Sequence, residues 1–274
     1  MIVSINQPCY LGWCGYFDRI KRSDIHIVLD HVQFEKGSFT NRCLIRQPDG
    51  RTMWLTIPVE KGRPINETRI IGGQRWQRKH REALRQAYGD RTWVPSGNYE
   101  LLWHALARAT HMLITFGLKE MAPTDIERAD ISNSMIRSST LGGNKLGRKS
   151  DLVLNLCKEV GATQYLSGPH GRDYLDIPSF IREGIEVVYH DFPAEQPVLS
   201  AVDHLFRSKE WPQAHLTSAH YSQNSEAEEE APLPAQALLA PAHRTVGVAG
   251  SSRSPNSKTP SRSSKTSSRP SLTR

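Results

Sequence analysis

Residues 2–30 read IVSINQPCYLGWCGYFDRIKRSDIHIVLD, and this stretch decides the fold. The apolar run 2–5 predicts a strand, residues 16–22 predict a helix, and the run 25–29 predicts a second strand. Pro8 and two glycines mark a turn between the first strand and the helix. A strand, a helix and a strand in this order favour a parallel pair at the start of a Rossmann-like sheet.

The same alternation returns near residue 131, after an inserted region. Residues 42–46 and 52–59 predict a hairpin around Pro48-Asp49-Gly50, and the region 61–126 is mainly helical, with one helix over 99–118. Residues 131–136, 163–166 and 185–189 then read as strands, and 148–160 as a helix with Ser150 as its N-cap. The fold class is therefore α/β, a Rossmann-like mostly parallel sheet with an inserted helical region.

The end of the chain differs from the rest in composition. Residues 210–274 contain an acidic run, a Pro/Ala/Leu segment and ten serines between 251 and 271. Such a composition buries too little apolar area to offset chain entropy, so we expect an α/β domain over 1–209 and a disordered tail over 210–274.

The charge of the protein is concentrated in this tail. Residues 1–230 hold 28 basic and 28 acidic residues, whereas residues 231–274 hold seven basic residues and no acid, which accounts for the net charge of +7. The body therefore lacks the field by which basic domains attract nucleic acid, and we expect no nucleic-acid partner. No apolar run is long enough for a membrane span and no leader is evident, so membrane insertion is not expected and the cytoplasm is the expected compartment.

The four cysteines show no metal-site spacing. Cys9, Cys14, Cys43 and Cys157 form no CxxC pair, so we predict no metal site and reduced thiols. The sequence motifs do not identify a cofactor.

Several short motifs, taken in order, resemble the WbqC-like family. They are Ile5-Asn6-Gln7-Pro8-Cys9-Tyr10, Gly15-Tyr16-Phe17, Asp30-His31-Val32-Gln33-Phe34, Asn41-Arg42, Trp54-Leu55-Thr56-Ile57-Pro58-Val59, Tyr165-Leu166-Ser167-Gly168, Tyr174-Leu175-Asp176 and Leu199-Ser200-Ala201-Val202-Asp203-His204-Leu205-Phe206. The resemblance covers about residues 2–207. It implies a role in bacterial surface-polysaccharide (O-antigen) and amino-sugar biosynthesis, with a small-molecule or nucleotide-sugar substrate. Cys9 stands where the family usually has an aromatic residue, which argues against a nucleophilic role for it.

Candidate site residues follow the predicted strands. Because ligands bind beyond the carboxyl ends of parallel strands, we expect one pocket there. Asp30 and Arg42 are the candidate catalytic residues, a carboxylate that acts as a base or orients an amine and a cation that clamps an anionic group. The candidate substrate-binding residues are Gln7, Tyr16, Gln33, Asn41, Ser167, Gly168 and Tyr174. For Asp30 a turn role, and for Arg42 a surface ion pair, remain open alternatives.

Two function classes remain open on the sequence. The first is an enzyme of surface-glycan or nucleotide-amino-sugar biosynthesis, a transferase that moves an acyl or aminoacyl group to an amino sugar. The second is a non-catalytic ligand-binding or scaffold protein of the same pathway. The first loop lacks the paired histidines that nucleotidyltransferases of Rossmann type use there, and no recognised nucleophile motif such as G-x-S-x-G occurs, which keeps the second class open.

Overall fold

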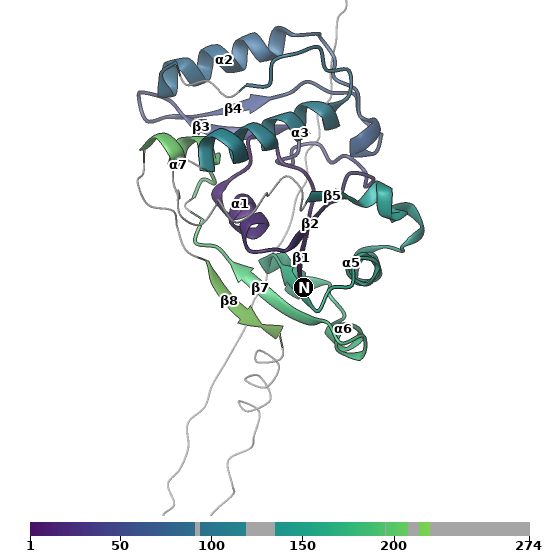
Figure 1. Ribbon diagram of the computed structural model, residues 1–274. Coiled ribbons are helices and arrows are strands. Elements are labelled where there is room, and N and C mark those ends of the chain that lie inside the picture. The colour runs from purple at the N-terminus through teal and green to yellow at the C-terminus, as the bar shows by residue number, and fades with distance from the viewer. Residues whose placement is uncertain (91–93, 119–134, 195, 208–213, 220–274) are drawn as a thin grey trace, which may run out of the picture. The chain divides into compact units, whose positions relative to one another are not determined.

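The computed structural model describes residues 1–90, 94–118, 135–194, 196–207 and 214–219, and its centre is a six-stranded sheet (Figure 1). The strand order is β5-β2-β1-β6-β7-β8. Their bounds are β1 (Ile2–Asn6), β2 (Ile25–Val28), β5 (Met135–Arg137), β6 (Gln164–Ser167), β7 (Glu186–Asp191) and β8 (His215–Ser218). The first five strands are parallel and β8 is antiparallel to β7, so the predicted mostly parallel α/β sheet is confirmed.

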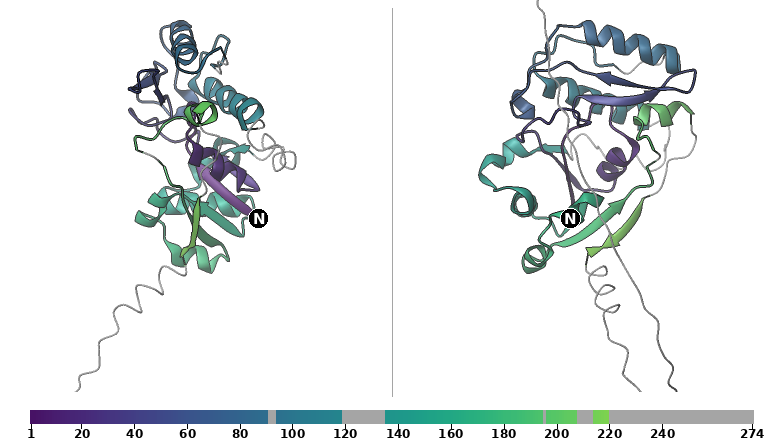
Figure 2. Two further views of the ribbon diagram at one scale, coloured as in Figure 1. Left: turned by 90° about the vertical axis from the view of Figure 1, so that its left-hand side faces the viewer. Right: turned by 180° about the vertical axis from the view of Figure 1, so that it is seen from behind.

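Helices cover both faces of this sheet, as Figure 2 shows from two further sides. Val3 and Ile5 of β1 join a core with α5 (Lys149–Glu159) and α6 (Ile177–Arg182). Ser4, which lies between Val3 and Ile5, faces the other side of the sheet, where α1 (Cys14–Lys21) packs. Its partner in register on β2 is His26, and the His26 ring lies 5.6 Å from the ring of Tyr16 on α1. The chain leaves β1 toward β2 and later returns to β6 on its other side, so the order of strands reverses between β1 and β6.

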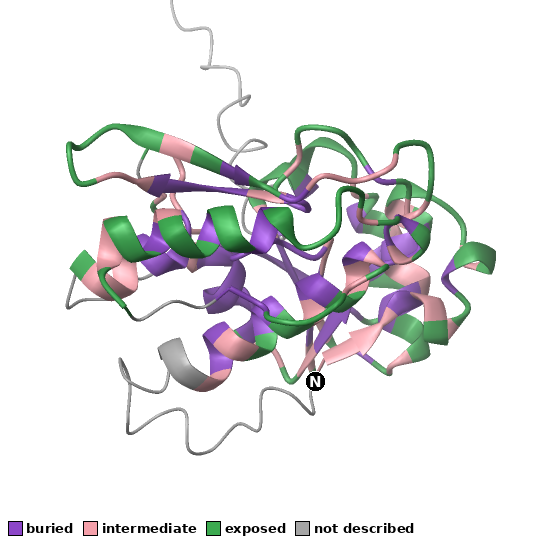
Figure 3. Ribbon diagram, turned by 90° about the horizontal axis from the view of Figure 1, so that it is seen from above, coloured by how far each residue is buried: buried purple, intermediate pink, exposed green. Residues whose placement is uncertain are grey.

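The inserted region lies between β2 and β5. It contains the hairpin β3 (Arg42–Arg46) and β4 (Thr52–Thr56), the helix α2 (Arg75–Tyr88) and the helix α3 (Leu102–Met112), which continues as a π-helical turn, Leu113–Leu118. Seen from above, α2 and α3 turn a buried side inward and an exposed side outward (Figure 3). Short 3-10 turns (Ile65–Glu67, Ser138–Leu141, Gly143–Lys145, Pro169–Asp173) and α7 (Ala201–Arg207) complete the fold.

Three local expectations differ from the structure. The helix predicted over 99–118 begins at Leu102, because Leu101 is extended and Leu102 N–H bonds to Thr68 O. Ser150 is not an N-cap: it lies inside the first turn of α5, and its hydroxyl accepts the N–H of Asp176 instead. The paired sheet also runs past residue 209, since β8 hydrogen-bonds to β7.

Some expectations fall on residues that the structure does not describe. These are residues 91–93 and 119–126 of the predicted helical region, 131–134 of the predicted strand 131–136, and 210–213 and 220–274 of the predicted tail. Within the described ranges, no helix is both long and apolar enough to cross a bilayer.

Candidate functional site

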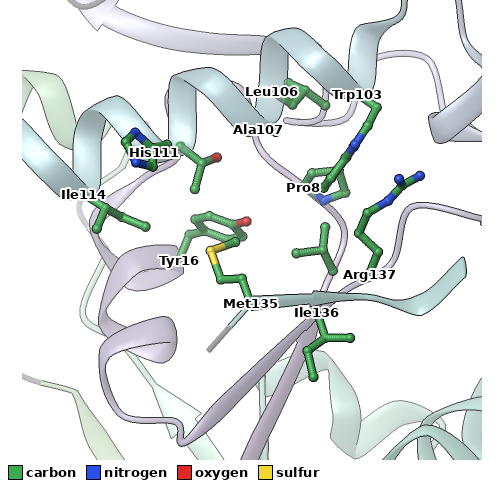
Figure 4. Close-up of a pocket in the computed structure, with 12 residues that line it drawn as sticks. Pro8, Tyr16, Trp103, Leu106, Ala107, His111, Ile114, Met135, Ile136 and Arg137 are labelled. Atoms are coloured by element: carbon green, nitrogen blue, oxygen red, sulfur yellow. The ribbon is translucent and has the colours of Figure 1, made fainter. Parts of the chain in front are cut away.

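A pocket of about 270 Å³ lies between α3 and the carboxyl ends of β1, β2 and β5. Pro8 and Tyr16 come from the first loop and α1, Met135 to Arg137 from β5, and Trp103 to Ile114 from α3 and the turn after it (Figure 4). Its walls are mainly apolar, with a few polar groups at defined points, as in binding sites for small organic ligands. The position agrees with the rule that α/β sheets bind ligands beyond the carboxyl ends of their strands.

Tyr16 is the polar centre of this pocket. The residue is 1% exposed, and its hydroxyl makes no hydrogen bond to the described residues, although Thr110 lies near it. Burial raises the pKa of the Tyr16 hydroxyl well above its ordinary value, and the neighbouring Cys9 thiol adds to this rise. The phenol therefore stays protonated and is available as a hydrogen-bond donor to a ligand.

Arg137 forms another wall of the pocket. Its guanidinium carbon lies 4.7 Å from the ring centre of Trp103, and its Nε donates to Asp30 Oδ2 at 2.6 Å. Arg137 is thus held in place from both sides, by an aromatic face and by a carboxylate. It presents a fixed cation at the rim of the pocket.

The Asp30 carboxylate, expected to be catalytic, is fully occupied by hydrogen bonds. Oδ1 accepts from the Ser138 hydroxyl at 3.0 Å and from the Ser139 N–H at 2.9 Å. Oδ2 accepts from Arg137 and from the Ser139 hydroxyl at 2.7 Å. Burial alone would raise the pKa of Asp30, but the Ser139 and Arg137 bonds outweigh it and hold the pKa below its ordinary value. The geometry gives Asp30 a positioning role, since it fixes Arg137 and the turn after β5.

Arg42, the second residue expected to be catalytic, lies on the hairpin and not in the pocket. Its guanidinium donates to Gly37 O and lies 4.0 Å from the ring centre of Trp54. Trp54 is 42% exposed, so this pair stands at the surface. The cation is engaged locally and is not aimed at the carboxyl edge of the sheet.

Gln7, Gln33 and Asn41 also bind the protein's own chain. Gln7 Oε1 accepts from Thr40, Gln33 Nε2 donates to Arg63 O, and Asn41 Nδ2 donates to Ile57 O. These bonds connect the loops after β1 and β2 to the inserted region. Of the nine predicted residues, Tyr16 alone lines the pocket described above.

Ser167, Gly168 and Tyr174 gather at a second place on the carboxyl edge, where β6 ends. A Cβ at Gly168 would lie 2.8 Å from Nη1 of Arg19, so the guanidinium of α1 presses against this glycine. Tyr174 lies near the same guanidinium, and Ser167 lies against Gly171. This group is centred on Arg19, a residue that the sequence patterns did not single out.

The buried thiols are not activated nucleophiles. Burial raises the pKa of Cys9 to about 12, although Arg19 acts in the opposite direction, and burial raises the pKa of Cys157 to about 12 and of Cys43 further. No disulfide joins the four cysteines. Nor do the residues that the structure describes contain a group of three or more His, Cys, Asp or Glu side chains that could hold a metal ion.

A larger hollow of about 600 Å³ opens beside α7. Trp13, Phe192 and Arg46 line it, together with Asp203, which accepts hydrogen bonds from Tyr88 at 2.7 Å and Arg207 at 3.1 Å. None of the sequence-predicted residues lies here. Its charged groups satisfy one another, so the smaller pocket, with its unbonded Tyr16 hydroxyl, is the stronger candidate.

The sequence analysis missed Arg19, Trp103, His111 and Arg137. One signal for Arg19 was present: positions 16, 19 and 20 share one face of a helix, and Arg19 places a cation beside the apolar Tyr16 and Ile20 on that face. The other three carry no comparable local signal, because a tryptophan, a histidine and an arginine in an amphipathic segment read as ordinary surface or core residues.

Comparisons with known proteins show the family of this chain. No solved structure matches the chain. The chain is 29% identical over 232 residues to Rv1507c of Mycobacterium tuberculosis, which is described as an uncharacterised protein, in a match that spans 74% of this chain and 92% of the relative. The family model described as the WbqC-like protein family matches residues 7–211, three quarters of the chain and nearly all of the described fold. The protein therefore belongs to the WbqC-like family.

Proposed function

We propose that this protein is an enzyme of surface-glycan or nucleotide-amino-sugar biosynthesis that transfers an acyl or aminoacyl group to an amino sugar. The observation that carries the proposal is the buried, protonated Tyr16 hydroxyl, which faces a largely apolar pocket without a hydrogen bond to the described residues. The link to amino sugars rests on the family resemblance of the motifs and not on the geometry.

The pocket groups fit the needs of such a transfer. The amine nitrogen of the sugar attacks the carbonyl carbon of a thioester, the carbon–sulfur bond breaks, and the proton lost by the amine goes to the departing thiolate. Tyr16 would donate to the carbonyl oxygen as negative charge develops on it, and His111 at the exposed side of the pocket would relay the proton. No covalent enzyme intermediate is required, which is consistent with the buried, protonated thiols.

The test is a product assay on the full chain. Purified protein is incubated with a panel of nucleotide-linked amino sugars and acyl or aminoacyl thioesters, and products are identified by mass spectrometry. Tyr16→Phe should lower the rate about 100-fold, the effect of losing one oxyanion donor. Tyr99→Phe is the matched control, because the Tyr99 hydroxyl donates to Ser96 O and does not line the pocket. Absence of product with every pair, or full activity of Tyr16→Phe, contradicts the proposal.

A second candidate function is ligand binding without catalysis. It is favoured by the fact that, among the described residues, three of the four thiols are buried and the Asp30 oxygens are already occupied. Titration calorimetry separates the two functions. A nucleotide-linked amino sugar that binds, yet gives no product with any thioester, identifies a binding protein.

A further inference from the structure

Arg19 is a buried cation at the point where the strand order of the sheet reverses. It lies in the second turn of α1 and is only 6% exposed. Its guanidinium reaches Gly168, the residue that follows β6, while Cys9 of the loop after β1 is also near. Arg19 therefore stands between the carboxyl ends of β1 and β6, the two strands that flank the crevice of this fold class.

No carboxylate among the described residues neutralises this charge. The neighbours close enough to affect Arg19 are the Cys9 thiol, the His26 imidazole and the phenols of Tyr16, Tyr165 and Tyr174, and Arg19 Nε has no hydrogen-bond partner. The adjacent Asp18 is committed elsewhere, to His190 and Arg22 at 2.7 Å each. Buried arginines are ordinarily paired, because an isolated charge loses its hydration without compensation.

Opposite Arg19, two glycines let the backbone of the turn after β6 lie close to neighbouring side chains. A Cβ at Gly168 would meet Arg19 Nη1 at 2.8 Å, and a Cβ at Gly171 would overlap with Ser167 Oγ. Two glycines thus let the β6 turn close over the guanidinium and over Ser167. The Tyr174 hydroxyl can donate a hydrogen bond, as an anion would require, whereas the Ser167 hydroxyl donates to Gly168 O at 3.0 Å.

We propose that Arg19 is the cation of an oxyanion site formed by α1 and the turn after β6, and that this site binds a phosphate or carboxylate group of a small-molecule ligand. The guanidinium supplies a fork of N–H donors that fits either group in bidentate geometry. The site is distinct from the pocket lined by Trp103 and Arg137, and it does not depend on the transfer reaction proposed above. Tyr16 lies near Arg19 and also lines the pocket. A ligand whose anionic group is bound by Arg19 would therefore place its remaining part in the pocket.

The test measures anion binding by the full chain at constant ionic strength. The probes are inorganic phosphate, uridine diphosphate and malonate, with sodium chloride as reference, and the readouts are calorimetry and the shift in melting temperature. At least one probe should bind and raise the melting temperature. Comparison of the three affinities shows whether the site prefers a free phosphate, a nucleoside diphosphate or a carboxylate.

Arg19→Met should weaken that binding about tenfold or more, because it removes the charge and both donors. Lys21→Met is the matched control: it removes one positive charge from an exposed position of the same helix and should bind like the wild type. In the reference salt Arg19→Met should melt no lower than the wild type, since the lost charge was unpaired. Wild-type binding by Arg19→Met, or failure of the wild type to bind any probe, overturns the proposal.

A second variant guards against a folding defect. Gly168→Ala keeps Arg19 but places a methyl group against its guanidinium, which must then move away. If Arg19→Met does not fold, Gly168→Ala decides the question. Weaker binding of the best probe supports the site, whereas unchanged binding overturns it. None of these measurements uses an acyl donor, so failure here is distinguishable from failure of the proposed transferase activity.

Discussion

Asp30 shows at the scale of a single residue how a predicted catalytic group can have a structural task. Its two oxygens accept bonds from Arg137, Ser138 and Ser139, and it is fully buried. Asp30→Asn removes the charge and should lower the free energy of unfolding by about 2 kcal/mol at pH 7, since hydrogen bonds to charged groups are worth about 1.5–3 kcal/mol. Chemical denaturation measures this loss.

The pH dependence of stability gives a second readout of Asp30→Asn. The folded pKa of Asp30 is held below its ordinary value of 3.8. Its contribution is therefore complete above the unfolded pKa, about 3.9, and is lost as the pH falls through the lower folded pKa. As the pH falls through this range, the free energy of unfolding should therefore decrease less for Asp30→Asn than for the wild type. Asp90→Asn, at an exposed position after α2, is the control and should behave like the wild type; equal acid sensitivity of Asp30→Asn and wild type contradicts the assignment.

The cysteines allow a chemical test of burial. Burial raises the pKa of Cys9 and Cys157 to about 12 and that of Cys43 further, so very little reactive thiolate exists at pH 8. In the native protein, iodoacetamide should modify the half-buried Cys14 first and leave the other three intact. Peptide mapping by mass spectrometry follows each site, and denatured protein provides full labelling. Alkylation of Cys9 as fast as that of Cys14 would contradict this environment.

At the scale of an element, β8 extends the fold beyond the boundary expected from composition. Its residues pair with β7 in antiparallel register, from Val188 with Ser218 to Asp191 with His215. Deletion of 214–274 should remove these bonds, expose the edge of β7 and lower the melting temperature by at least ~3 °C, about 1 kcal/mol for a domain of this size.

Deletion of 220–274 is the matched control for this prediction, because it keeps β8 and the buried Ala219. From the composition of that segment we expect an unchanged melting temperature. Both variants are compared with the full chain by calorimetry at one concentration. Equal melting temperatures of the two truncated proteins would show that β8 contributes nothing to the stability of the sheet.

At the scale of the whole molecule, charge separates the body from the end of the chain. Residues 1–230 carry no net charge, and the seven surplus cations all lie after residue 230. We therefore expect that any binding of single-stranded RNA at low salt comes from 231–274 and disappears when that segment is deleted. Fluorescence anisotropy with a labelled oligonucleotide measures this. Salt-dependent binding retained by the 1–230 protein would reveal a basic site on the body.

Local sequence determined the elements and their order along the chain. The alternation in 2–5 and 25–29, the turn at Pro48-Asp49-Gly50 and the helical spacing in 16–22 depend on neighbours a few residues apart, so each could be read directly. The β-α-β order also implied parallel pairing, because a crossover of that length joins parallel strands. The carboxyl edge as the place of the site followed from the same topology.

Only the tertiary structure decided which side chains meet at that edge. The partners of Asp30 come 107 to 109 residues later, and the guanidinium of Arg19 meets a glycine that follows β6. Such meetings depend on strand order and on how the inserted region folds back, which are set by long-range burial and not by local propensity. For this reason Asp30 and Arg42 proved to be engaged with their own chain, while the unpaired Arg19 and the unbonded Tyr16 hydroxyl became visible only once the sheet was assembled.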